Sequence, residues 1–126
     1  MALRGIRGAT TVERDDPGQI LPATQALLEA ILAANPDLDP ADIASAWFTL
    51  TPDLVSVHPA RAARDMGWGL VPLMCATEIA VPGALPRCIR VLIHWNTGLD
   101  QNMVCHVYLN KAQSLRPDLS IKDGVK

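Results

Sequence analysis

The stretch Cys88-Ile-Arg-Val-Leu-Ile-His-Trp95 is the clearest strand in the sequence, and the rest of the fold is predicted outward from it. Its β-branched isoleucine and valine residues are of the type that strands favour. Side chains alternate between the two faces of a strand, so Arg90 and His94 are predicted to share a face. The two predicted faces are Cys88, Arg90, Leu92 and His94 on one side, and Ile89, Val91, Ile93 and Trp95 on the other.

Four further segments on either side of this stretch are strand-like. The first, Leu3 to Val12, contains Gly5 and Gly8. Glycine inside a strand indicates a bulge or the close approach of another part of the chain. The other three predicted strands are Ile43 to Leu50, Leu70 to Met74, and Val104 to Leu109.

Helical segments lie between these strands. Asp16-Pro17 is typical of a helix start, and the apolar residues that follow recur at spacings of one, three and four until Asn35-Pro36. Pro59 to Met66 predicts a short helix, and Asp39 to Asp42 could open another before the strand at 43–50. Thr51-Pro52-Asp53 breaks the chain, and Pro82-Gly83 turns it. The order predicts an α+β protein, a mixed sheet with helices on one face, of ferredoxin-like or barrel-like character.

Length and composition exclude several classes of function. A chain of 126 residues is expected to form one domain. The net charge of −2 comes without the clustered basic surface that nucleic-acid binding requires. No run reaches the roughly 20 apolar residues of a membrane span, and no apolar signal segment follows Arg4 and Arg7. We therefore expect a soluble cytoplasmic protein that binds neither nucleic acid nor membrane.

The sequence contains no recognisable metal, nucleotide or nucleophile motif. The wide spacing of the cysteines predicts reduced thiols, and the histidines lack ligand spacing, so no metal or cofactor is expected. The residues concerned are Cys75, Cys88, Cys105, His58, His94 and His106.

Four polar residues in apolar surroundings are candidates for ligand binding. Arg90 lies within an apolar strand, where an unpaired buried guanidinium costs several kcal/mol, so it pairs either with an internal acid or with a ligand. Arg7 suits two-pronged recognition of a carboxylate beside the small Gly8, or lies at a surface or interface. For Glu78 three interpretations are open: an exposed acid in a loop, the partner of an arginine, or the acceptor of a hydrogen bond from a ligand hydroxyl. Tyr108 is either a half-buried strand residue or a donor of a hydrogen bond to a ligand. Such a set, with both arginines buried, suits a small anionic hydroxy-acid but names no reaction.

These residues fall within sequence blocks that appear in one register along nearly the whole chain. On these blocks the chain resembles the monofunctional chorismate mutases found as homotrimers. The blocks are Arg4 to Asp15, Thr51 to Leu54, Pro59 to Arg64, Gly67-Trp68, Val71-Pro72, Cys75, Glu78, Cys88 to Val91, His106 to Leu109, and Leu115 to Ser120.

The resemblance implies an isomerase of phenylalanine and tyrosine biosynthesis in the shikimate pathway, which rearranges chorismate to prephenate without a cofactor. It implies a homotrimer around a pseudo-α/β barrel, with each active site between two subunits. Residues 1–116 are then the single chorismate mutase domain, and residues 117–126 are expected to be a flexible C-terminal tail.

The resemblance also implies roles for individual residues. In the catalytic pair, Arg90 contacts the breaking ether bond and a carboxylate, while Glu78 meets the ring hydroxyl. The other implied substrate-binding residues are Arg7 and Tyr108 at carboxylate oxygens, Cys75 at the ring hydroxyl, Arg64 at the mouth of the site, and Ala60 and Leu115 along the cavity.

Two positions depart from the family pattern, and two other functions remain open. His58 stands where the family often has a bulky aromatic residue, and Arg61 where it often has lysine, which affects the rim of the site. One alternative is a small trimeric imine deaminase, although the chain carries Arg7, Glu78 and Arg90 in an order that class lacks. The other alternative is a non-catalytic trimeric module that binds a small carboxylate.

Overall fold

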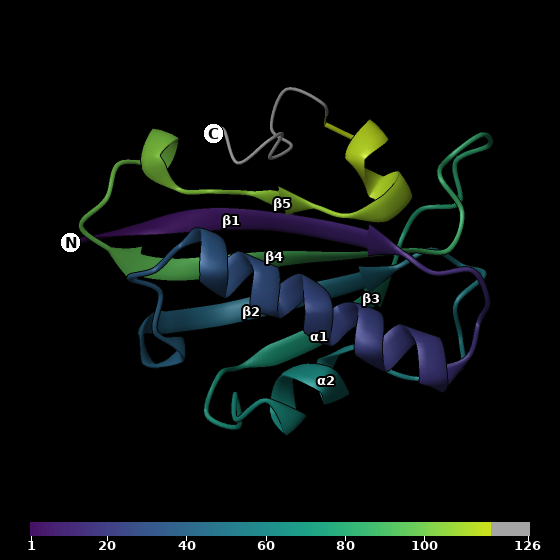
Figure 1. Ribbon diagram of the computed structural model, residues 1–126, viewed down its shortest axis with the longest axis horizontal. Helices are drawn as coiled ribbons and strands as arrows, with labels where there is room; N and C mark the ends of the chain where they lie inside the picture. Colours follow the sequence, from purple (N-terminus) through teal and green to yellow (C-terminus); the bar gives the residue numbers. More distant parts are fainter. Residues whose placement is uncertain (117–126) are drawn as a thin grey trace.

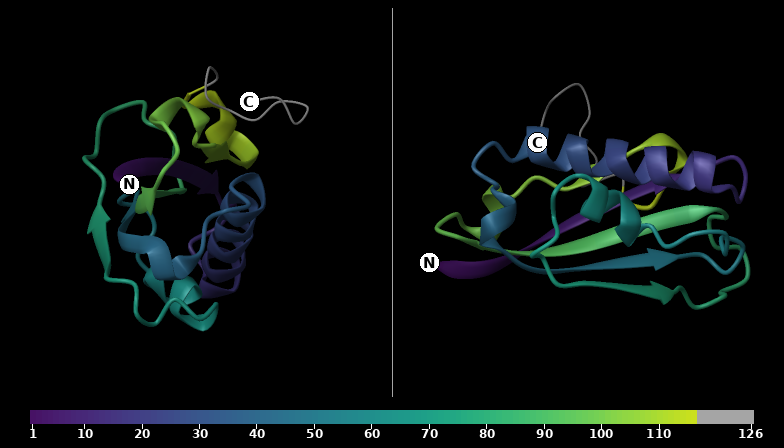
Figure 2. Two further views of the ribbon diagram at one scale, coloured as in Figure 1. Left: turned by 90° about the vertical axis from the view of Figure 1, so that its left-hand side faces the viewer. Right: turned by 90° about the horizontal axis from the view of Figure 1, so that it is seen from below.

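The computed structural model describes residues 1–116, so the predicted C-terminal tail lies outside the described residues. Five strands form one mixed sheet in the order β3-β2-β4-β1-β5, and two α-helices cover one face of it (Figure 1, Figure 2). The α+β prediction is confirmed. The elements are β1 (Ala2–Thr11), α1 (Pro17–Ala34), η1 (Pro40–Asp42), β2 (Ile43–Leu50), α2 (Ala60–Asp65), β3 (Leu73–Thr77), β4 (Cys88–Thr97), η2 (Gln101–Met103), β5 (Val107–Tyr108) and η3 (Asn110–Ser114), where η marks a 3-10 helix.

The strand predicted first, β4, is the centre of the sheet. It pairs antiparallel with β1 on one side and with β2 on the other, and the outer strands β5 and β3 are parallel to their neighbours. The predicted alternation is confirmed, because Ile89 and Ile93 are fully buried beneath the helices while Arg90 and Leu92 are exposed on the opposite face. The sheet therefore has one face covered by helices and one face that residues 1–116 leave largely open.

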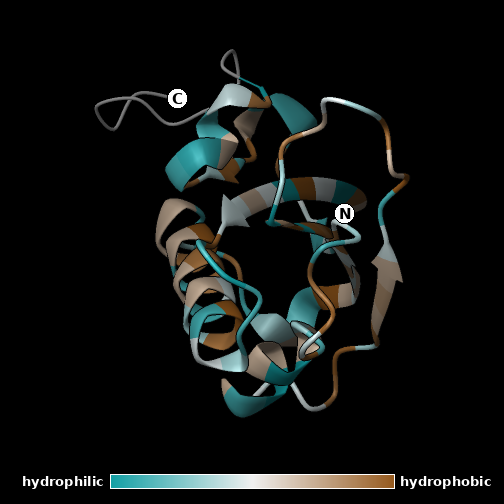
Figure 3. Cartoon of the chain, turned by 90° about the vertical axis from the view of Figure 1, so that its right-hand side faces the viewer, coloured by the Kyte–Doolittle hydropathy of each residue, from teal (hydrophilic) through white to brown (hydrophobic). Residues whose placement is uncertain are grey.

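The long helix α1 forms where its capping residue and apolar stripe predict. The side chain of Asp16 accepts a hydrogen bond from the Gly18 N–H at 2.9 Å and so caps the helix start. Leu27 and Ile31 are fully buried against the sheet. Figure 3, a view from one end of the molecule, shows hydrophobic and hydrophilic residues interspersed along α1, as a one-faced helix requires. Within residues 1–116, neither α1 nor any other helix combines the length and apolar character needed to cross a membrane.

The small size of Gly8 lets α1 lie close to the sheet. A Cβ atom at Gly8 would come within 2.7 Å of Ile31 Cδ1 and 3.0 Å of Val91 Cγ1. At Gly5 the nearest atom would be Leu92 Cδ1 at 3.6 Å, which is an ordinary contact. The predicted close approach is therefore confirmed at Gly8 but not at Gly5.

Replacing Gly8 by alanine is expected to destabilise the fold by about 1–3 kcal/mol, because a methyl group inserted into a packed core forces its neighbours to move. Gly5→Ala on the same strand is the matched control and is expected to cost less, since it has room. Urea denaturation of the two variants measures both free energies of unfolding. Equal stabilities would show that the helix yields to the extra atom without strain.

The edge strand β3 begins later than predicted. The sequence predicted a strand from Leu70 to Met74, but the strand runs from Leu73 to Thr77. The N–H of Val71 donates to the carbonyl of Trp68 at 3.0 Å and closes a turn. Leu70 is 99% exposed as a result. The prediction was wrong because it counted an exposed leucine as part of an apolar strand.

The last strand is shorter than the predicted Val104 to Leu109. Only Val107 and Tyr108 form β5. The side chain of the buried Asn35 at the end of α1 accepts from the Cys105 N–H and donates to the Cys105 carbonyl, both at 2.9 Å. These two bonds tie the main chain at Cys105 to the helix, so it does not join the sheet there.

Candidate active site

A groove of about 620 Å³ lies on the face of the sheet opposite the helices. Residues of β1, β2 and β4 form its floor, and the end of the described chain closes one side. Four of the predicted site residues line it: Arg7, Arg90, Tyr108 and Leu115. The other lining residues are Gly8, Trp47, Thr49, Val91, Leu92, His94 and Arg116.

Arg90 lines this groove and pairs with Glu78. Its Nε is 3.5 Å from Oε2 of Glu78, and the Arg90 side chain is 46% exposed. Thr49 lies directly opposite Arg90 in the β2–β4 pair, and its hydroxyl donates to the same Oε2. The sequence predicted that Arg90 pairs either with an internal acid or with a ligand. The geometry is compatible with both, because Arg90 contacts Glu78 and its side chain is also open to the groove. The expectation that the two arginines are buried is wrong for residues 1–116 of the single chain, in which both side chains are exposed.

Arg7 projects from β1, next to the part of β4 that carries Arg90. Its N–H donates to Nδ1 of His106 at 2.9 Å. The β1–β5 ladder proper starts one residue later, where Gly8 pairs with Val107. The imidazole of His106 therefore extends this ladder by one bond and fixes the main chain that carries Arg7.

Tyr108 lies deeper than the half-buried strand position that the sequence predicted. It pairs with Ala9 across β5 and β1 and belongs to a small apolar cluster with Cys88. Leu115 packs against this cluster from the end of the described chain. The groove is thus closed at this end by packed side chains.

The three cysteines are free thiols, as predicted. Burial raises the pKa of the Cys88 thiol, and the positive charge of Arg90 partly opposes that rise. Cys88 is therefore an inert apolar residue beside the groove. Among residues 1–116, no three His, Cys, Asp or Glu side chains are grouped so that they could hold a metal ion.

The remaining predicted residues lie away from the groove within this chain. Cys75 lines a separate depression of about 370 Å³ beside β3, together with His58. Ala60 is buried in the core and Arg64 is exposed on α2. The structure thus brings together Arg7, Arg90, Tyr108 and Leu115, joins Glu78 to them through Arg90, and leaves Cys75, Arg64 and Ala60 apart.

Several residues of the groove were not predicted from the sequence. Thr49 and Trp47 face Arg90 and Leu92 across the β2–β4 pair. The alternation along the central strand did place Leu92 and His94 on the face of Arg90. The register between β2 and β4, which would identify Thr49, cannot be seen in either strand alone.

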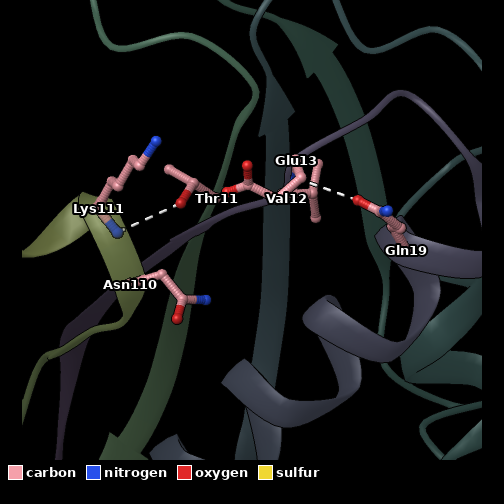
Figure 4. Close-up of a pocket in the computed structure, with 6 residues that line it drawn as sticks. All are labelled: Thr11, Val12, Glu13, Gln19, Asn110 and Lys111. Carbon is pink, nitrogen blue, oxygen red and sulfur yellow. Dashed lines mark hydrogen bonds between the residues drawn. The ribbon is translucent and has the colours of Figure 1, made fainter.

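A further depression of about 500 Å³ lies where the end of β1, the start of α1 and η3 meet (Figure 4). Oε1 of Gln19 accepts from the N–H of Glu13 at 3.0 Å. The N–H of Lys111 donates to the hydroxyl of Thr11 at 3.3 Å. These bonds join three elements, and the depression contains none of the predicted site residues.

The chain matches one family model and several known proteins. The model named chorismate mutase type I covers residues 3–119. A protein of Thermus thermophilus named chorismate mutase AroH is 53% identical over 117 residues, which is 93% of this chain and 96% of the relative. The protein of the same name from Bacillus subtilis (strain 168) is 48% identical over 122 residues, or 96% of this chain and 95% of the relative.

Solved structures agree with these matches. A chorismate mutase from Clostridium thermocellum superposes with a TM-score of 0.85 at 48% sequence identity, covering 87% of this chain and 97% of that one. The fold, the family model and the relatives together show that the chain belongs to the chorismate mutase type I family and is an isomerase, a chorismate mutase of aromatic amino acid biosynthesis.

Proposed function

We propose that chorismate is converted to prephenate in the groove around Arg90. The observation that carries this proposal is an arginine open to a 620 Å³ groove, with a second arginine on the adjacent strand. Chorismate carries two carboxylates, so two cations on a chain of net charge −2 form a local positive field where a dianion would bind. The reaction breaks one C–O bond as it forms one C–C bond, and it requires no proton transfer.

The residues of the groove match the two demands of such a rearrangement. The substrate must be held folded with its reacting ends in contact, and Arg7 and Tyr108 are placed to bind its carboxylates. Negative charge develops on the ether oxygen, and the terminal nitrogens of Arg90 stabilise it most in the transition state. Glu78 accepts a hydrogen bond from the ring hydroxyl and so orients the ring.

We further propose that the active enzyme is a homotrimer with each site between two subunits. Large apolar side chains remain exposed on the open face of the sheet, which suits burial against another copy. Cys75 and Arg64 would complete a neighbour's groove, which explains why they do not line the groove of their own chain, whereas Ala60 is buried within its own chain. The exposed apolar residues are Leu3, Trp47, Met74 and Leu92.

The proposal extends to location and domain organisation. A reducing cytoplasm suits three free thiols. Residues 1–116 act as a single chorismate mutase domain, consistent with one sheet and the core beneath its helices.

The direct test of the function is an ultraviolet assay in which purified protein consumes chorismate, with prephenate identified as the sole product. A folded protein that leaves chorismate unchanged would contradict the proposal.

Arg7→Ala is expected to raise KM by about tenfold or more, with a smaller effect on kcat. Arg7 holds a carboxylate in both the bound substrate and the transition state, and such uniform binding appears mainly in KM. Arg14→Ala is the matched control, because Arg14 is an exposed arginine outside the groove. Steady-state kinetics on both variants measure the difference, and an unchanged KM in Arg7→Ala would remove Arg7 from the substrate site.

A further inference from the structure

We propose that Thr49 is a positioning residue for the rearrangement, because its hydroxyl holds the Glu78 carboxylate and limits its ion pair with Arg90. The inference rests on the proposed function, which gives Glu78 and Arg90 their contacts with the substrate. Thr49 itself is not assigned any contact with the reacting atoms. Thr49 acts by fixing the position of the Glu78 carboxylate.

The strand register places the three residues around one point. Thr49 pairs with Arg90 on β4 and, across its other edge, with Ala76 on β3. Two residues beyond Ala76, the N–H of Glu78 donates to the carbonyl of Leu50 at 2.8 Å and fixes the main chain there. The Glu78 side chain then reaches both the Thr49 hydroxyl and Arg90.

One carboxylate oxygen is shared between the two partners. Oε2 of Glu78 accepts from the Thr49 hydroxyl and lies 3.5 Å from Nε of Arg90. A fully formed arginine–carboxylate pair is two-pronged, with N···O distances of about 2.7–2.9 Å. The observed pair is longer, at 3.5 Å from Nε to Oε2, so it is not a closed two-pronged pair. Thr49 thus stabilises a partial ion pair.

Loss of this hydrogen bond frees the carboxylate to rotate onto the guanidinium fork. Glu78 is only about a quarter exposed, so its attraction to Arg90 is less screened than at an open surface. A closed pair weakens the positive charge that Arg90 offers to the ether oxygen. It also withdraws the oxygen that Glu78 offers to the ring hydroxyl. Both consequences raise the barrier of the reaction while leaving Arg7 in place.

Thr49→Val removes the hydroxyl and nearly preserves the shape of the side chain. We expect kcat to fall about tenfold while KM changes less than about threefold, because the lost interaction acts on the transition state. The melting temperature should not fall, since valine is favoured in strands, and that measurement separates the effect from misfolding. Thr49→Ser restores the hydroxyl and is expected to recover most of the lost kcat. An unchanged kcat in Thr49→Val, or a rise in KM alone, would overturn the inference.

A double-mutant cycle tests whether Thr49 acts through Glu78. Glu78→Gln removes the charge that Thr49 restrains, so Thr49→Val is expected to add little to it. Independent, multiplying losses in the double variant would overturn the role assigned to Thr49. Arg90→Ala, measured in parallel, separates this failure from that of the proposed function. If Arg90→Ala is inactive and Thr49→Val is fully active, only the inference about Thr49 fails, whereas an active Arg90→Ala contradicts the proposed function itself.

Discussion

Arg90→Ala is expected to lower kcat by a factor of about 100 to 1,000, the largest effect of any single substitution in the groove. A positioned donor that stabilises charge in a transition state contributes about 3–4 kcal/mol to barrier lowering. Arg90 is the only described arginine that β4 presents to the groove, and Glu78 holds its Nε from one side. Under the proposed mechanism, its loss removes the cation that stabilises the charge developing on the ether oxygen.

Arg90→Lys keeps the charge and tests the geometry. A lysine ammonium is a compact point charge and cannot contact an ether oxygen and a carboxylate oxygen through two fixed prongs. We therefore expect Arg90→Lys to recover little of the lost kcat. Chorismate consumption measures both variants, with Arg14→Ala as the control for loss of a surface arginine. An Arg90→Ala variant within about threefold of the unmodified enzyme would show that another group stabilises the transition state.

The fold was predictable from the sequence wherever one face of an element is buried. The alternation in β4 and the apolar spacing in α1 identify both elements, because burial on one side imposes a period on the sequence. The edge strands were predicted less well. Leu70 is apolar but exposed in a turn, and Asn35 holds Cys105 away from β5 through contacts that are remote in sequence. The local pattern of apolar residues cannot show contacts between residues that are remote in sequence.

The residues that line the groove were predicted in part, for a related reason. Arg90 and Arg7 are identifiable because a charged residue within an apolar strand needs a partner. Thr49 is an ordinary strand residue by sequence, and only the pairing of β2 with β4 gives it meaning. Cys75 and Arg64 were grouped with Arg90 by resemblance, and one chain keeps them apart. Cys75 and Arg64 are expected to lie away from Arg90 within one chain if the site is shared between subunits.

Met74→Asp tests this assembly directly. Met74 lies on the open face of the sheet beside Trp47, and it is 55% exposed in the single chain. An aspartate at this position therefore lowers the folding stability of an isolated chain only a little. An unpaired carboxylate buried between copies costs several kcal/mol, which weakens the association by a factor of about 100 or more. We expect Met74→Asp to be a folded monomer that has lost at least about 100-fold in activity, because each groove then lacks its neighbour's residues.

Leu70→Asp is the matched control, since Leu70 is also an exposed apolar residue but lies in the turn before β3. It is expected to keep both the assembly and the activity. Analytical ultracentrifugation gives the mass of each species, and circular dichroism shows whether it is folded. A monomeric Met74→Asp with full activity would mean that one chain contains the whole site, and a fully active trimer would mean that this face is not the interface. Loss of assembly and activity together, against an unaffected Leu70→Asp, would support a place for Cys75 and Arg64 at a neighbour's groove, because within residues 1–116 of one chain neither lines the groove of Arg90.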